Sequence, residues 1–338
     1  MKQAVMTAPG RIEFQDATVP KPRPGEVLLR VKRIGVCGSD VHVYHGEHQY
    51  VKYPLIQGHE LAAEIAEVGG QVRGFSAGQR VTIQPQVFCG RCYQCTHGSY
   101  HICENLKVMG FQLPGCAREY LSVPAEKLIE LPAELSLDQG ALIEPVAVAV
   151  HAIGRAASIR GKRVLVLGAG TIGNLVAQAA AGLGAGAVAV TDVIDSRLSL
   201  AERCGVAHCL PSAGDLSNKI EEIFGADGAD VVFDCAGVPA TMMQAVESSH
   251  KGADIIIVAV FPPETVVNLA AVQRRELRLI GTHMYQKKDF ELGIDLVRTG
   301  KVALEALITT HFDFQDYTSA YRYIDEKKDE TMKVIIHV

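Results

Sequence analysis

The chain has 338 residues, more than one ordinary hydrophobic core accommodates, so we expect two domains. Hydrophobic residues make up 48% of it and charged residues 21%, which excludes a disordered chain, and the net charge of −5 excludes a basic surface for nucleic acid. The first residues lack the apolar core of a signal peptide, and the apolar runs are too short to cross a bilayer, so the sequence predicts a cytoplasmic protein without a membrane partner.

Short β-like segments, separated by glycine and proline, fill the first 140 residues. The clearest of them are residues 26–34, 60–68, 80–84 and 119–123. Frequent turn residues between short strands are typical of a compact domain that is mostly β. We therefore expect the first domain to be built mainly from strands.

Three separated motifs in this region carry side chains that bind metals. Cys37 opens a segment that also contains Ser39 and His42, His59 lies in a Gly-His-Glu motif, and Glu144 precedes a proline. One cysteine, one histidine and one glutamate would hold Zn²⁺ with a fourth position open, which is the pattern of a catalytic zinc. Taken singly, each residue also has a structural interpretation, as a core cysteine, a turn histidine and a carboxylate at a helix N-terminus.

Four cysteines, Cys89, Cys92, Cys95 and Cys103, lie within fifteen residues of one another. Four thiolates saturate one tetrahedral Zn²⁺ and leave no place for a substrate, so this cluster predicts a structural zinc. The chain has nine cysteines, and an odd number with this close spacing is more typical of metal binding in a reducing compartment than of a disulfide scaffold. Four incidental free thiols are the alternative.

After Pro145 the pattern changes to apolar strands that alternate with helix-like segments. Such βαβ alternation predicts a parallel sheet covered by helices on both faces. The expected strands are residues 163–168, 188–192, 230–235, 253–260 and 278–281, and the expected helices are 171–183, 195–204 and 239–248. The C-terminal part adds two helices and a strand, at residues 289–299, 316–327 and 333–338.

The first strand of this region ends in a Gly-x-Gly-x-x-Gly loop, residues 168–173, and a helix follows directly. Its glycines permit a tight turn, close approach of a pyrophosphate and close packing of the helix, whose N-terminus favours phosphate. Asp192 ends the next strand, where a carboxylate binds both ribose hydroxyls and repels a 2′-phosphate. The sequence thus predicts an NAD site, with a glycine-rich turn that binds no ligand as the alternative. The predicted cofactor-binding residues are Gly168, Gly170, Thr171, Ile172, Gly173, Asp192 and Arg197.

Taken in this order, the Cys-Gly-Ser-Asp segment, the Gly-His-Glu motif, the cysteine cluster, the Glu-Pro pair and the glycine-rich loop form a recognisable set. Over essentially its whole length the chain resembles the zinc-containing medium-chain dehydrogenase/reductase family. The resemblance implies an α/β protein with two domains. Residues 1–150, with 286–338 returning to them, would form a mostly β, GroES-like catalytic domain, and residues 151–285 a Rossmann domain with a doubly wound parallel sheet. A homodimer or homotetramer, joined through strands at the edge of that sheet, is also implied.

The Glu-Pro pair is similar to the polyol branch of the family, typified by sorbitol dehydrogenase, whereas ethanol-type members usually have a cysteine there. The resemblance implies that Cys37, His59 and Glu144 bind the catalytic zinc. It makes Glu60 a neighbouring carboxylate that can approach the metal when water leaves.

Two positions that border the expected substrate pocket, Val43 and Met284, depart from the sorbitol pattern. Residues 52–60 and 310–315 are more similar to sugar-acid 5-dehydrogenases of the gulonate and idonate type. The expected substrate is therefore a small molecule, a polyol or sugar acid with a secondary alcohol. A threonine-type or polyol-phosphate dehydrogenase of the same family is the rival, and a non-catalytic NAD-binding protein is the alternative from another class.

From these assignments we expect hydride transfer from the secondary alcohol to NAD. Zinc would lower the pKa of the substrate hydroxyl, and Ser39 is placed to accept its proton. His42 either passes that proton to solvent through the cofactor ribose or makes only a phosphate or surface contact. The predicted catalytic residues are Ser39, His42 and Glu60.

Overall fold

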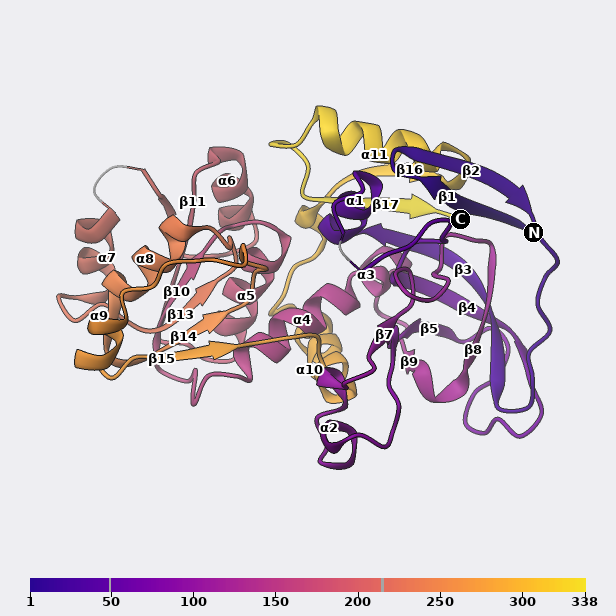
Figure 1. Ribbon diagram of the computed structural model, residues 1–338, viewed down its shortest axis with the longest axis horizontal. Helices are drawn as coiled ribbons and strands as arrows, with labels where there is room; N and C mark the ends of the chain where they lie inside the picture. The colour runs from indigo at the N-terminus through magenta and orange to yellow at the C-terminus, as the bar shows by residue number, and fades with distance from the viewer. Residues whose placement is uncertain (49, 214–215) are drawn as a thin grey trace. The chain divides into compact units, whose positions relative to one another are not determined.

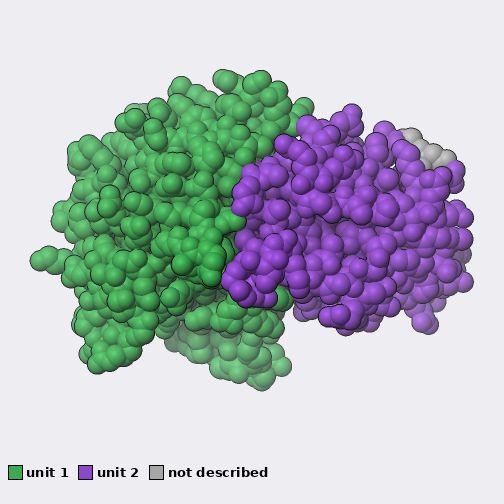
Figure 2. Space-filling view, turned by 180° about the vertical axis from the view of Figure 1, so that it is seen from behind, with its two compact units in different colours: residues 1–144, 286–294, 308–338 green, residues 145–285, 295–307 purple. Residues whose placement is uncertain are grey.

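The computed structural model describes residues 1–48, 50–213 and 216–338. These form two compact units, coloured separately in Figure 2. Unit 1 comprises residues 1–144, 286–294 and 308–338, and unit 2 comprises residues 145–285 and 295–307. The change of unit falls between Glu144 and Pro145, so the Glu-Pro pair of the sequence marks the boundary. No helix within the described ranges has both the length and the hydropathy needed to cross a membrane.

Unit 1 is built on a seven-stranded sheet (Figure 1). Six of its strands follow one another in the order β16 (Ile308–Asp313), β17 (Lys333–His337), β3 (Glu26–Val36), β4 (Glu60–Val68), β5 (Arg80–Ile83) and β9 (Leu128–Glu130). The seventh, β8 (Tyr120–Pro124), pairs with β3. The long strand β3 is antiparallel to β4, β8 and β17, so segments from three distant parts of the chain meet on it.

Shorter elements complete unit 1. Two pairs of strands lie outside the large sheet, β1 (Lys2–Ala8) with β2 (Arg11–Asp16) and β6 (Gln86–Val87) with β7 (Lys107–Val108). The helices are α1 (Gly38–Tyr44), α2 (Tyr93–Thr96), α3 (Leu137–Ala141) and α11 (Tyr317–Glu326). Tyr317 and Tyr321 of α11 are buried against core residues such as Leu29 and Ile34 of β3, which attaches the C-terminal helix to the sheet.

Unit 2 is a six-stranded, fully parallel sheet. Its strands follow the order β12 (His208–Pro211), β11 (Ala187–Asp192), β10 (Arg163–Leu167), β13 (Ala229–Asp234), β14 (Ser249–Ile257) and β15 (Arg278–Gly281). Its helices are α5 (Thr171–Gly182), α6 (Asp195–Arg203), α7 (Leu216–Phe224), α8 (Pro239–Ser248) and α9 (Leu269–Arg274). This is the doubly wound Rossmann order, in which connections leave the central strand β10 toward opposite edges of the sheet and leave a crevice for a nucleotide at the carboxyl ends.

Two helices belong to both units along the chain: α4 (Ile143–Ile153) starts in unit 1, and α10 (Lys287–Arg298) ends in unit 2. Short 3₁₀ turns are η1 (Tyr100–Ile102), η2 (Ala125–Lys127), η3 (Glu305–Leu307) and η4 (Phe314–Asp316). The expected bounds of β4, α8 and β15 are those observed, whereas β12 and α7 were not expected. The short edge strand β12 has no alternation of apolar residues to indicate it.

Candidate metal and cofactor sites

The pairing of β3 with β4 brings predicted metal ligands together. The two strands are antiparallel with Gly35 opposite Glu60, so the residues that follow β3 lie beside those that precede β4. Cys37 directly follows β3 and caps α1, and His59 directly precedes β4. One ligand atom from each of Cys37, His59 and Glu60 lies within 4.8 Å of the others.

Glu60 forms an ion pair with a lysine that no sequence motif indicated. Lys333, on β17, donates to both carboxylate oxygens of Glu60, at 2.8 and 2.9 Å, and both side chains are almost fully buried. A Cβ at Gly35 would lie 2.1 Å from one of these oxygens, so only glycine leaves room for the carboxylate. Burial alone would lower the pKa of Lys333, but Glu60, Cys37 and Glu144 raise it, so the lysine stays charged beside Glu60.

Glu144 lies at the start of α4 and is only 5% exposed. Because its charge contributes to the raised pKa of Lys333, its carboxylate belongs to the same buried charged surroundings. Within the described part of the chain, however, the group of atoms within 4.8 Å of one another comprises Cys37, His59 and Glu60, and Glu144 lies outside it.

A buried carboxylate, Asp40, lies against His59. Oδ1 of Asp40 is 3.5 Å from Nδ1 of His59, and Oδ2 accepts a hydrogen bond from the N–H of Cys37 at 3.1 Å. Burial alone would lower the pKa of His59, but the negative charges of Asp40 and Cys37 raise it well above its usual value. The surroundings therefore favour a cation at this position, and thiolate, imidazole and carboxylate donors with a carboxylate behind the histidine fit Zn²⁺.

Two further buried side chains connect Asp40 to the C-terminal helix. The side-chain amide of Gln57 donates to the carbonyl oxygen of Asp40 at 3.0 Å, and the hydroxyl of Tyr321 on α11 donates to the Gln57 oxygen, also at 3.0 Å. These contacts join residues distant in sequence, which is why no local pattern pointed to them.

The two residues predicted to move protons, Ser39 and His42, both lie on α1. Ser39 is partly exposed and His42 is exposed to solvent. Nδ1 of His42 is 2.8 Å from Oε2 of Glu47. The hydrogen bond from His42 lowers the pKa of Glu47, so the carboxylate stays ionised next to the imidazole.

Ligand atoms of the four clustered cysteines lie within 4.8 Å of one another, in the chain segment that contains α2, the helix labelled in Figure 1. The sulfur of Cys89 is 4.0 Å from that of Cys95, and the sulfurs of Cys92 and Cys103 are 3.8 Å apart. A tetrahedron with Zn–S bonds of about 2.3 Å has S–S edges of about 3.8 Å, so these distances fit one zinc ion. Backbone N–H groups of Arg91 and Cys92 lower the pKa of Cys89 to about 6, which favours the thiolate.

In unit 2, the glycine-rich loop lies between β10 and α5. Gly168 has a φ of 96°, and a Cβ at Gly173 would lie 1.8 Å from the carbonyl oxygen of Gly168, so both positions require glycine. Gly170 is the N-cap of α5, and no atom lies within 4 Å of the place where its Cβ would be. This open space leaves room for a phosphate beside the first turn of the helix, which begins with Thr171 and Ile172.

Asp192 lies at the end of β11, as predicted, but its carboxylate is buried. Oδ2 accepts from the N–H of Ala169 at 2.7 Å, and Oδ1 accepts from the N–H of Ile194 at 2.9 Å. Arg197, on α6, lies 3.7 Å from Oδ2. The acid thus fixes the glycine-rich loop as well as lying where a ribose would bind.

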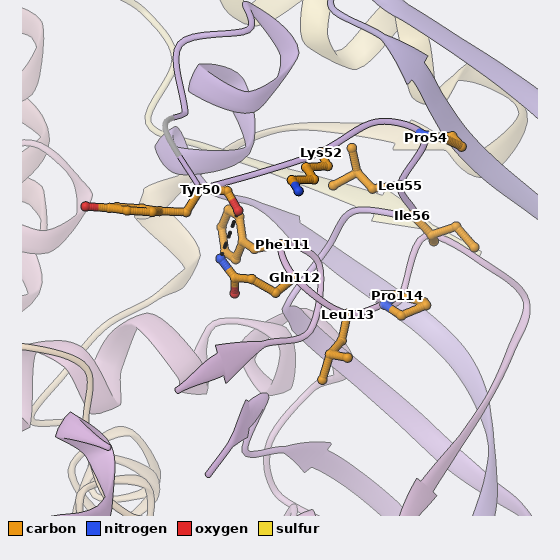
Figure 3. Close-up of a pocket in the computed structure, with 9 residues that line it drawn as sticks. All are labelled: Tyr50, Lys52, Pro54, Leu55, Ile56, Phe111, Gln112, Leu113 and Pro114. Carbon is orange, nitrogen blue, oxygen red and sulfur yellow. Dashed lines mark hydrogen bonds between the residues drawn. The ribbon is translucent and has the colours of Figure 1, made fainter. Parts of the chain in front are cut away.

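Unit 1 has a hollow of about 280 Å³, whose lining residues come from two segments, residues 50–56 and 111–114 (Figure 3). Lys52 is the one cation among its lining residues, and the close-up shows Tyr50 directed away from the others. The ring of Phe111, which lines the hollow, is centred 5.0 Å from the rings of both His48 and His59. Phe111 therefore lies next to the candidate metal ligand His59 and also lines the hollow.

Two family models match the chain. Residues 23–133 match the alcohol dehydrogenase GroES-like domain, and residues 171–299 match the zinc-binding dehydrogenase domain. A 2-dehydro-3-deoxy-L-galactonate 5-dehydrogenase from Pseudoalteromonas atlantica is 37% identical over 90% of this chain and 89% of its own length. A sorbitol dehydrogenase from Halalkalibacterium halodurans is 34% identical over 99% of each chain.

Solved structures agree in fold along the whole chain. A protein described as a short chain alcohol dehydrogenase from Escherichia coli, complexed with NADH, superposes with a TM-score of 0.93 at 30% identity, covering 100% of this chain and 99% of its own. A zinc-binding dehydrogenase from Sinorhizobium meliloti, bound to NADP, gives a TM-score of 0.90 at 29% identity with the same coverage. The chain belongs to the zinc-containing medium-chain dehydrogenase/reductase family, in its polyol branch.

Proposed function

We propose that the protein oxidises a secondary alcohol of a polyol or sugar acid with NAD, by means of one catalytic zinc. The observation that carries the proposal is the buried group of Cys37, His59 and Glu60 with Glu144 nearby, in a chain of the polyol branch. A bound zinc supplies Lewis-acid chemistry, because it lowers the pKa of a hydroxyl that it coordinates. NAD, held by the glycine-rich loop and Asp192, would supply the hydride acceptor.

In this proposal Cys37, His59 and Glu144 are the zinc ligands. Glu60 is the weaker candidate, because Lys333 already occupies both of its oxygens at 2.8 and 2.9 Å. Asp40 orients the His59 imidazole from the opposite ring nitrogen. Four sulfurs, those of Cys89, Cys92, Cys95 and Cys103, hold a second zinc with a structural role.

The substrate proton leaves through side chains of α1. Ser39 accepts it from the substrate hydroxyl, and His42 passes it on to solvent, with Glu47 stabilising the protonated imidazole at 2.8 Å. The alternative for His42, a phosphate or surface contact, would leave the reaction unchanged when this residue is replaced.

The hollow next to Phe111 supports a sugar acid as substrate, because Lys52 places a positive charge at its wall. Among the relatives, the 37% identical protein is named for a sugar-acid 5-dehydrogenase activity. A carboxylate of the substrate would pair with Lys52, and Phe111, whose ring is 5.0 Å from that of His59, would contact the substrate between the lysine and the metal ligands.

NAD rather than NADP is the proposed cofactor. A 2′-phosphate would meet the buried negative charge of Asp192, and the next residue, Val193, is 80% exposed and carries no charge to compensate. Arg197 lies 3.7 Å from Asp192. Its positive charge is therefore partly neutralised by Asp192 and is less available to pair with a 2′-phosphate.

The same proposal includes a homodimer or homotetramer and a cytoplasmic location. Nine free cysteines, four of them arranged for zinc, require a compartment in which thiols stay reduced.

Replacement of Glu144 tests the proposal. We expect Glu144→Ala to contain one zinc per chain instead of two and to lose at least about a thousandfold in kcat/KM, since three ligands become two. The exposed Glu134 provides the matched control, and Glu134→Ala should keep both metal ions and normal turnover. Full turnover in Glu144→Ala would refute the assignment. A panel of gulonate, idonate, sorbitol, threonine and galactitol phosphate, each with NAD and with NADP, measured by nicotinamide absorbance, then separates the candidate substrates and cofactors.

A further inference from the structure

A second cluster of imidazole and carboxylate groups lies in unit 1, away from the ligands already described. It consists of Asp138, in the first turn of α3, with His311 on β16 and His337 on β17. Ligand atoms of these three residues lie within 4.8 Å of one another. Neither the cysteine lobe nor the proposed catalytic zinc uses any of them.

The sheet register explains why the two imidazoles share one face. β16 and β17 are parallel with His311 opposite Ile335, so His337 lies two residues further along the neighbouring strand and on the same side. The two rings approach edge to face with centroids 4.9 Å apart. On the other side of β17, Arg33 of β3 pairs in register with His337.

The distances between Asp138 and the two imidazoles are close to those between the ligands of a bound metal ion. Nε2 of His311 is 2.9 Å from Oδ2, and Nε2 of His337 is 3.9 Å from Oδ1. Adjacent ligands of a tetrahedral Zn²⁺ lie about 3.3–3.5 Å apart, between these two values. The Nε2 atom of His337 is shielded from solvent and has no hydrogen-bond partner among the described residues. The Nε2 atom of His337 thus lies near the Asp138 carboxylate but forms no hydrogen bond with it. A purely structural ion pair between Asp138 and its neighbours does not explain this unpaired nitrogen.

The charges of the cluster also suit a cation. Partial burial alone would raise the pKa of Asp138, but Arg33 and His311 lower it, so the carboxylate is ionised. Burial, assisted by Arg33, lowers the pKa of His337, so this imidazole is neutral near pH 7. Metal ligands bind as ionised carboxylate and neutral imidazole, which are the forms expected for Asp138 and His337.

We propose that Asp138, His311 and His337 form a third metal site of the protein, which takes a divalent transition-metal ion such as Zn²⁺, Ni²⁺ or Cu²⁺. Two imidazoles and one carboxylate select these ions over Mg²⁺ and Ca²⁺, which prefer oxygen. Arg33 donates to Oδ1 at 2.5 Å, so Oδ2, which faces His311, is the oxygen that would be available to a metal. Its positive charge weakens the site, so we expect a dissociation constant on the order of micromolar and water in the remaining positions.

Occupancy would connect three distant parts of the chain, since α3, β16 and β17 each contribute one ligand. The site therefore acts as a reversible clamp on the C-terminal strands. This role is independent of the proposed dehydrogenase activity, because none of the three residues belongs to the catalytic or cofactor machinery.

Titration of the tag-free, zinc-loaded enzyme with Ni²⁺ in a calorimeter tests the site. We expect the wild-type chain to bind one Ni²⁺ and to gain about 5 °C in Tm at 100-fold excess over the dissociation constant. His311→Gln and His337→Gln should each weaken binding at least about tenfold and lose the gain in Tm. His45 is the matched control, because it pairs with one carboxylate, Asp325 at 2.9 Å, as His311 does.

His45→Gln should bind Ni²⁺ as the wild type does. The proposal is overturned if the wild-type chain binds no added Ni²⁺, or if either His311→Gln or His337→Gln binds it with unchanged affinity. Tm values measured without added Ni²⁺ show whether a variant is folded. Should His311→Gln unfold, His337→Gln alone decides the question. The His337 side chain is 37% exposed, so its replacement should leave the fold intact.

Discussion

Replacement of Lys52 tests whether the substrate carries a negative charge that pairs with this lysine. It lies on the wall of the hollow next to Phe111 and is exposed, so its replacement should leave the core intact. We expect Lys52→Met to raise KM for gulonate or idonate about five- to tenfold, with kcat and the KM for sorbitol unchanged. Lys107, exposed on β7 and outside the hollow, is the control, and Lys107→Met should change neither KM. Equal effects on charged and uncharged substrates would contradict the proposed carboxylate contact.

Asp230, on β13 and paired with Arg163 at the start of β10, is a residue whose contribution to stability depends on pH. Both of its oxygens accept from the Arg163 side chain, at 2.9 and 3.0 Å, and this lowers its pKa to about 2. Because the folded-state pKa lies below the unfolded value of 3.8, the stabilisation is complete above about pH 5 and is lost as pH falls through about 2.

We therefore expect Asp230→Asn to lower the free energy of unfolding by about 1–2 kcal/mol at pH 7 and by about half as much at pH 3. Chemical denaturation of both proteins across this range measures the difference. Asp227→Asn removes an exposed carboxylate nearby and should have no such effect. A difference that grows toward low pH would have the wrong sign for an ionised Asp230 in the folded state.

Among the elements, the loop around α2 is the one that we expect to depend on the proposed structural zinc more than on its packing. None of the four residues of α2 is buried, so few apolar contacts hold this helix in place. We expect Cys95→Ser to bind one zinc fewer per chain and to lose roughly 5–10 °C in Tm, since the ordering energy of the loop comes from the ion. The zinc that supports activity should remain, so turnover per folded molecule stays near normal.

Zinc analysis and thermal melting of the same preparation check this. Cys209→Ser is the control, because Cys209 lies on β12 of unit 2 and belongs to no metal group in the described residues. Loss of both zinc ions in Cys95→Ser would mean that the two sites are not independent.

On the scale of the whole molecule, unit 2 has an edge strand and exposed apolar side chains that suit a second copy of the chain. β15 ends the six-stranded sheet, and Val260, Val266 and Leu269 are 96%, 83% and 68% exposed. Exposed apolar surface next to an unpaired edge is typical of an interface. We expect sedimentation to show a dimer or tetramer, and Val266→Glu combined with Leu269→Glu to shift it toward smaller species. A monomeric wild-type protein would contradict the proposed assembly.

Much of this molecule follows from local sequence patterns, and the exceptions have a common cause. The glycine-rich loop, the strand that ends at Asp192 and the four cysteines are contiguous motifs, so the sequence predicted their positions. Lys333 could not be predicted in the same way, because its partner Glu60 lies 273 residues earlier and the two meet only through sheet pairing. The same holds for the contact between Tyr321 and Gln57.

The position of β17 in its sheet has a consequence for how the protein is made. This strand lies between β16 and β3, and it carries Lys333, which neutralises Glu60. In a nascent chain that has not yet reached residue 333, Glu60 has no counter-ion to offset the cost of its burial, and β3 lacks one of its neighbouring strands. We therefore expect the arrangement of Cys37, His59 and Glu60 to form only after synthesis has passed β17, whereas the cysteine cluster depends on no residue after Cys103.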